Sequence, residues 1–175
     1  MSADLILCML GGNDLDLNWR RFLVTNGATV QSNLSPYEYG ANLRRLATMI
    51  CGYDALPLLG DVTDHELTIR GPYMSALAGR DVSSLLAAQD IRGITDRTLA
   101  AFRGERQRVV DEMNLLDVPF AADFAVYARP LLVGPDGVHP SLLAHDIIGT
   151  RVCMTILQAL MRLEAAGSMA LGIAT

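Results

Sequence analysis

The stretch that decides the fold is Leu5-Ile6-Leu7-Cys8-Met9-Leu10, followed at once by Gly11-Gly12-Asn13-Asp14. The apolar residues are continuous rather than alternating, which is typical of a strand covered on both faces in a parallel sheet. The glycines end this strand and begin a loop. Because α/β proteins form their sites beyond the carboxyl ends of parallel strands, this loop is a candidate site.

The rest of the chain alternates further short apolar runs with helical patterns. Residues 55–59 and 118–120 are the next strand candidates, and Pro57 makes the first of them less regular. Strands that alternate with helices favour a parallel sheet with helices on both faces. We therefore expect one domain over residues 1–175, with a three-layer α/β/α arrangement.

Two helices can be predicted, one from the capping residues at its start and the other from its apolar face. Ser35-Pro36-Tyr37-Glu38 combines a capping serine, a proline at the first helical position and a glutamate that completes a capping box. A longer helix is expected from Thr95 or Asp96. Its inner face is formed by Leu99, Phe102, Val109 and Met113, and its outer face by Arg103, Glu105, Arg106 and Arg108.

Composition excludes several classes of protein. The chain has 175 residues, of which 51% are hydrophobic, so a disordered or fibrous chain is excluded. Fourteen basic and nineteen acidic residues give a net charge of −5, and without a basic run we expect no nucleic-acid partner. No apolar run reaches the roughly 20 residues of a membrane span, and the first residues lack the basic start of a signal peptide. We therefore expect a cytoplasmic protein.

A second candidate motif, Asp136-Gly137-Val138-His139-Pro140, precedes the last helical pattern. An aspartate in a turn just before a histidine can reach the imidazole, fix its tautomer and stabilise the imidazolium. Asn13, on the glycine-flanked loop, offers an amide donor for developing negative charge. Each motif alone also suits an ordinary turn or helix start, but their joint occurrence at these positions favours one shared crevice.

Together the two motifs resemble the SGNH hydrolases, also called the GDSL family of esterases and lipases. In that family a Gly-x-Asn-Asp block follows a central strand, and an Asp-x-x-His block lies near the C-terminus. The resemblance extends from about residue 4 to about residue 165. It implies a flavodoxin-like sheet, Asn13 and Gly12 in an oxyanion hole, and Asp136 and His139 as the acid and base of ester hydrolysis.

The chain departs from the family at the nucleophile, which stays unknown. The family begins with a strand that ends in Gly-Asp-Ser, whereas here the Asn13 block lies almost at Met1, as if the N-terminal strands were missing. Gly60-Asp61-Val62 imitates that motif but has valine in place of serine, and Thr63 lies between the other blocks rather than before them. We therefore expect weak or no turnover by this chain alone.

The missing strand has a structural consequence for partners. It would leave Leu5 to Leu10 as an exposed apolar sheet edge, which invites pairing with a second copy or with another chain. We expect a small-molecule ester or acyl substrate and no cofactor. Because Asp61, Asp64 and His65 lack a further cluster of ligands, we interpret them as a solvated loop and expect no metal.

Two other interpretations stay open at this point. The same fold could serve as a non-catalytic module that binds an acyl or sugar group. An unrelated α/β protein could also carry both motifs by chance, but that interpretation fails if Asn13 and His139 lie on one crevice.

Overall fold

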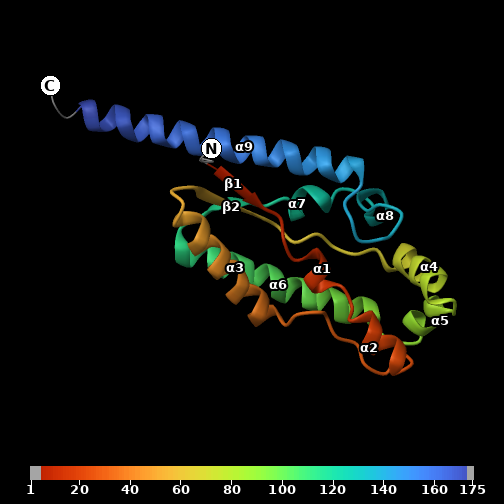
Figure 1. Ribbon diagram of the computed structural model, residues 1–175. Helices are drawn as coiled ribbons and strands as arrows, with labels where there is room; N and C mark the ends of the chain where they lie inside the picture. The colour runs from red at the N-terminus through yellow and green to blue at the C-terminus, as the bar shows by residue number, and fades with distance from the viewer. Residues whose placement is uncertain (1–4, 173–175) are drawn as a thin grey trace.

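The computed structural model describes residues 5–172, with side chains through residue 162, and it shows an α/β fold built on one parallel sheet (Figure 1). The strands are β1 (Leu5–Cys8), β2 (Leu56–Gly60) and β3 (Leu116–Val118), in the order β1-β2-β3. Both pairings are parallel. The predicted parallel sheet is thus confirmed, although β3 begins two residues before the predicted third strand.

Pro57 is tolerated in β2 because of where β3 begins. Pro57 lies opposite Ile6 of β1, whereas the pairing of β2 with β3 starts only at Leu58, opposite Leu116. The proline therefore occupies a part of β2 that has a neighbouring strand on one side only, where a missing amide donor costs least.

Helices connect the strands and cover the sheet. Their bounds are α1 (Gly12–Leu15), α2 (Trp19–Val24), α3 (Pro36–Cys51), α4 (Leu67–Ala78), α5 (Val82–Ala87), α6 (Ile91–Met113), α7 (Ala121–Phe124), α8 (Arg129–Leu132) and α9 (Leu142–Gly172). The capping box predicted for α3 is confirmed. The hydroxyl of Ser35 accepts from the amide of Glu38, and the Glu38 carboxylate accepts from the amide of Ser35.

The side chains of the sheet divide between two apolar clusters, one on each face. Cys8 and Leu59 pack with α3 and α6 on one face, in a cluster that includes Leu43 and Phe102. Leu58 and Val118 pack with α9 on the other face, in a cluster that includes Phe120, Ala144 and Ile148. Figure 1 shows α9 on one side of the sheet and α3 with α6 on the other, which confirms the three-layer arrangement.

Helix α6 differs from the prediction in its start and in its polar face. It begins at Ile91 because the carboxylate of Asp90 caps it, accepting from the amide of Gly93. The prediction that Arg106 points outward is wrong, since this side chain is buried. Its Nε donates to the Gly60 carbonyl at 2.7 Å, and its Nη2 donates to the Leu59 carbonyl at 2.6 Å and also pairs with Asp117.

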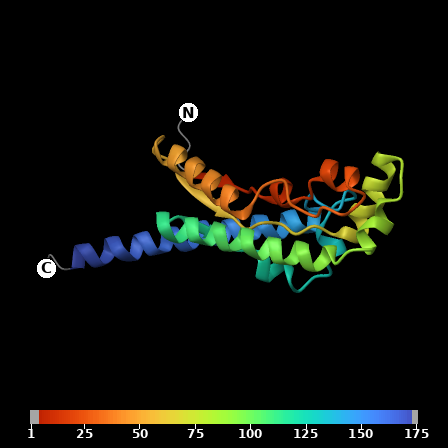
Figure 2. The ribbon, with the colours of Figure 1, turned by 90° about the horizontal axis from the view of Figure 1, so that it is seen from below.

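The last helix extends well beyond the sheet, as Figure 2 shows from below. Near its start Ala144 and Ile148 are buried against the sheet, whereas Leu157 and Met161 are 59% and 68% exposed. None of the helices in the described part of the chain has the length and apolarity needed to cross a membrane.

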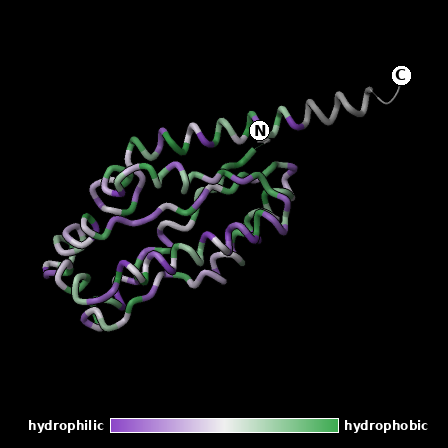
Figure 3. Tube along the Cα trace, turned by 180° about the vertical axis from the view of Figure 1, so that it is seen from behind, coloured by the Kyte–Doolittle hydropathy of each residue, from purple (hydrophilic) through white to green (hydrophobic). Residues whose placement is uncertain are grey.

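The outer edge of β1 pairs with no strand among residues 5–172. Leu5 and Leu7 on this edge are 39% and 42% exposed, and Figure 3 shows the apolar character of the strand that follows the N-terminus. A groove of about 610 Å³ runs beside it, between β1 and the residues Leu46, Met49 and Tyr53. The predicted exposed apolar edge is therefore present in the structure.

Candidate functional site

The first part of the candidate site is a tight turn at the carboxyl end of β1. Gly11 has a φ of +113°, and a Cβ there would lie 3.1 Å from side-chain atoms of both Tyr39 and Val62, so glycine suits this position. The chain then forms α1 rather than an open loop. Within it the Asn13 carbonyl accepts from Asn33 Nδ2 at 2.8 Å, while the Asn13 side chain is exposed.

The second part is the turn between α8 and α9. The carbonyl of His139 accepts from the amide of Gly134 at 2.7 Å, and Gly137 supplies the positive φ of +74° that closes the turn. One carboxylate oxygen of Asp136 accepts from the amides of Val138 and His139, both at 3.1 Å. The other oxygen lies 2.5 Å from His139 Nδ1.

This arrangement sets the charge of Asp136 and the orientation of the imidazole. Partial burial raises the pKa of Asp136, but the hydrogen bonds from the His139 ring and from two backbone amides together hold that pKa below its usual value. The carboxylate therefore stays ionised at neutral pH and favours the tautomer with a proton on Nδ1. Nε2 is then the nitrogen available to accept a proton. The His139 side chain is 70% exposed.

The two turns meet at one cavity of about 440 Å³. Gly12 and Asn13 reach it from the turn after β1, and His139 reaches it from the turn before α9. Thr63, from the loop after β2, and His145, from the first turns of α9, also line it. The structure thus brings together the residues that the sequence assigns to the oxyanion hole and to the base.

The loop after β2 is not the solvated loop that the sequence analysis predicted. Asp61 is 6% and His65 only 2% exposed. One oxygen of Asp61 accepts from the Val62 amide and from Arg103 Nε, and the other accepts from the Ala121 amide. This carboxylate therefore fastens the end of β2 to its neighbours. Among the residues that the structure describes, no cluster of side chains could hold a metal ion.

A second cavity, of about 320 Å³, adjoins the first. Both are lined by Thr63, Val138 and Pro140. Its apolar wall includes Phe124 and Leu132, and its polar rim includes Arg103 and Arg129, which pair with Asp61 and Asp64. Because these charges compensate one another, the cavity is suited to an uncharged group.

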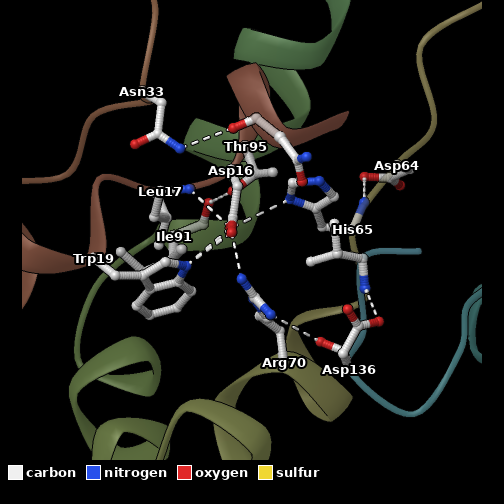
Figure 4. A network of polar contacts seen from close by, with 12 residues as sticks. Asp16, Leu17, Trp19, Asn33, Asp64, His65, Arg70, Ile91, Thr95 and Asp136 are labelled. Carbon is white, nitrogen blue, oxygen red and sulfur yellow. Dashed lines mark hydrogen bonds and ion pairs between the residues drawn. The ribbon is translucent and has the colours of Figure 1, made fainter. Parts of the chain in front are cut away.

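A buried polar network lies behind the two turns, and no pattern in the sequence predicts it. Its centre is Asp16, which is 6% exposed and accepts from the Leu17 amide and from Trp19 Nε1 (Figure 4). Arg70 of α4 pairs with the same carboxylate. His65 Nδ1 lies 3.6 Å from Asp16, while burial lowers the pKa of His65 and favours its neutral form. No motif links these residues in the sequence, because they come from separate elements.

Comparison with known proteins agrees with this architecture. No family model and no curated protein matches the sequence. A variant of an acetyl-xylooligosaccharide esterase from Geobacillus has a TM-score of 0.57 and 20% identity, over 89% of this chain and 60% of its own. A protein described as a GDSL-like lipase, from Parabacteroides merdae, has a TM-score of 0.53 and 18% identity, over 88% and 60%.

A further solved structure, an alpha/beta hydrolase enzyme from the metagenome of Lake Arreo in Spain, has a TM-score of 0.54 and 18% identity, again over 60% of its length. The chain thus spans about 60% of the length of these three proteins. At this level of identity the likeness shows the fold alone. We conclude that this chain has the α/β fold of these three proteins, an esterase, a GDSL-like lipase and an alpha/beta hydrolase.

Proposed function

We propose that this chain provides the oxyanion donor and the acid–base pair of an SGNH-type ester hydrolase. One observation carries the proposal, namely that Asn13 and His139 line a single cavity while Asp136 holds the His139 ring. An oriented imidazole beside an amide donor is the arrangement that acyl transfer from an ester requires.

The chemistry follows from the geometry of these groups. His139 Nε2 takes the proton of an attacking hydroxyl while that oxygen forms a bond to the ester carbonyl carbon. Asp136 stabilises the imidazolium that results. The carbonyl oxygen becomes an oxyanion, which accepts from the Asn13 side chain and from the amide of Gly12. That amide stands in the first turn of α1 and has no partner inside the helix. The oxyanion then collapses to a carbonyl as the ester C–O bond breaks, and the proton passes from His139 to the departing alkoxide oxygen, which leaves as an alcohol.

The nucleophile has no counterpart in this sequence, because the Gly-Asp-Ser block of the family is not matched. Thr63 carries a hydroxyl on the cavity, but no hydrogen bond joins it to His139 in the described part of the chain. We therefore propose that the chain alone turns over little or no ester. The second cavity, beside Thr63 and Val138, would take the acyl or alcohol part of a small uncharged substrate.

We propose that a further strand pairs with the open edge of β1. Exposed leucines and an adjoining apolar groove favour the addition of a strand from another chain or a second copy. Size-exclusion chromatography with light scattering tests this. A monomer at micromolar concentration that shows no aggregation would count heavily against pairing through this edge.

Hydrolysis of p-nitrophenyl acetate tests the proposed chemistry. The variants His139→Ala and His145→Ala form a matched pair, because both histidines line the same cavity but only His139 is held by a carboxylate. We expect any turnover to disappear in His139→Ala and to persist in His145→Ala. Turnover that survives His139→Ala would refute the assignment of the base. Ester binding without turnover, and no labelling by a fluorophosphonate, would indicate a non-catalytic acyl- or sugar-binding module instead.

A further inference from the structure

The two turns of the candidate site are fixed relative to each other by a third element. In the described part of the chain, no hydrogen bond runs directly between residues 11–16 and residues 134–140. Helix α4 lies against both turns instead. Their relative position therefore depends on what α4 contributes.

Arg70 makes the connection through its guanidinium group. Its Nη2 pairs with the carboxylate of Asp16, which follows α1 directly. Its Nη1 donates to the backbone carbonyl of Asp136 at 3.3 Å (Figure 4). One side chain thus holds the end of the turn that carries Asn13 and the start of the turn that carries His139.

The guanidinium group is itself held in place. The Arg70 side chain is 12% exposed, and its central carbon lies 5.5 Å from the ring centroids of both Trp19 and Tyr73. Cation–π contacts of this kind orient a guanidinium group as well as stabilise it. Trp19 Nε1 also donates to both oxygens of Asp16, so the partner of Arg70 is fixed too.

The backbone of α4 and of Glu66, the residue that caps it, supports the same turn. The amide of Glu66 donates to the Gly137 carbonyl at 2.9 Å. A Cβ on Gly137 would lie 2.6 Å from the amide nitrogen of Arg70, so the turn rests directly on the first turn of α4. The carbonyls of Asp136 and Gly137 are thus both held by this segment, whereas His139 is not, so the shape of the turn in which Asp136 meets His139 depends on these contacts.

We propose that Arg70 is a positioning residue: by bridging Asp16 and the Asp136 carbonyl, it holds the Asn13 turn against the His139 turn and keeps Asp136 in the geometry in which it pairs with His139. The role for catalysis rests on the proposed function. Arginine suits it because the planar fork presents two nitrogens to two acceptors at once, whereas lysine offers a single ammonium on a flexible stem.

Three variants separate bridging from simple stabilisation. Arg70→Met removes the charge and both donors. Arg70→Lys keeps a charge beside Asp16 but cannot span both acceptors. Arg44→Met is the control, because Arg44 pairs with Glu112 on the surface between α3 and α6, away from the site. Chemical denaturation gives the stability of each variant.

The decisive measurement is nitrogen NMR of the His139 ring, which reports its tautomer and does not require catalytic turnover. The chain has only three histidines, so assignment is straightforward with His65→Gln and His145→Gln variants. In the unaltered protein we expect the proton on Nδ1, facing Asp136. In Arg70→Met we expect the preference for Nδ1 to fall by about threefold or more as the turn loosens. Arg44→Met should leave it unchanged.

The lysine variant decides whether the bridge matters. We expect Arg70→Lys to recover most of the stability lost in Arg70→Met without restoring the His139 tautomer. An unchanged tautomer in Arg70→Met, or full restoration by lysine, would overturn the proposal. If the protein hydrolyses p-nitrophenyl acetate, Arg70→Met should lower kcat by about 10- to 100-fold with little change in KM. Lack of activity in the unaltered protein is what a chain without its own nucleophile should show and leaves the bridge untouched, because the NMR result tests the bridge alone.

Discussion

Four described glycines have a positive φ, and replacing Gly137 by alanine should destabilise the protein more than the same exchange at any of the others. Gly137 has a φ of +74°, and its missing side chain faces backbone rather than flexible atoms. A Cβ would lie 2.6 Å from the Arg70 amide nitrogen and 2.8 Å from the Glu66 carbonyl oxygen. The turn and the first turn of α4 must therefore separate to admit it.

The magnitude can be worked from two contributions. Left-handed backbone costs a non-glycine residue about 1–2 kcal/mol. Displacement of well-packed atoms by an added carbon costs about 1–3 kcal/mol more. We therefore expect Gly137→Ala to lower the free energy of unfolding by about 2–5 kcal/mol, which is within the stability of a typical domain, so that the variant still folds.

Urea denaturation followed by circular dichroism measures this, with Gly79→Ala as the matched control. Gly79 ends α4 at a φ of +61° and has no atom within 4 Å of its Cβ position, so alanine there carries only the backbone cost. The difference between the two variants isolates the close contact of the turn with α4. Equal losses of stability in Gly137→Ala and Gly79→Ala would refute the reasoning.

Three further outcomes are expected. Arg106→Met should lower the free energy of unfolding by about 3–5 kcal/mol, because it leaves Asp117 and two buried carbonyls without their donor. The surface exchange Arg108→Met, measured alongside in urea, should have a much smaller effect, because exposed ion pairs contribute little. Gly104→Ala, on an open face of α6, should instead raise the midpoint of urea unfolding, with a gain of about 0.5–1 kcal/mol. Stability should fall on acidification below pH ~6.5, because burial lowers the pKa of His65, so the unfolded chain binds a proton that the folded chain does not. The slope from this group, at most about 1.4 kcal/mol per pH unit, ends at the folded pKa; a His65→Gln variant with the same slope would contradict this origin.

Local patterns in the sequence were sufficient for the sheet and for the two turns. A continuous apolar run, a capping box at Ser35 and Glu38, and a glycine-flanked Asn13 each depend on neighbours within a few positions. The pair of Asp136 and His139 is of the same kind, since the hydrogen bonds of the carboxylate stay inside one turn. Such features could be predicted because the chemistry and the spacing lie in one short segment.

The buried charges could not be predicted in this way. Arg106 is a charged residue at a position that the helical pattern places on the solvated face. It is buried because carbonyls of β2 accept its hydrogen bonds. Asp16 and Arg70 likewise meet only after folding. A charged residue is buried when partners from distant segments satisfy it, and those partners leave no periodic pattern in the sequence. The burial of His65 was missed for the same reason.

The position of the two turns along the chain has a consequence for biosynthesis. Asn13 is synthesised before β2 and β3, and His139 only after all three described strands. Contacts between positions so far apart in the sequence form late in folding, because the long segment between them must first close into a loop. Nascent chains stalled before residue 134 would contain the three described strands but not the turn that completes the pocket, and so could not act on an ester by the proposed chemistry.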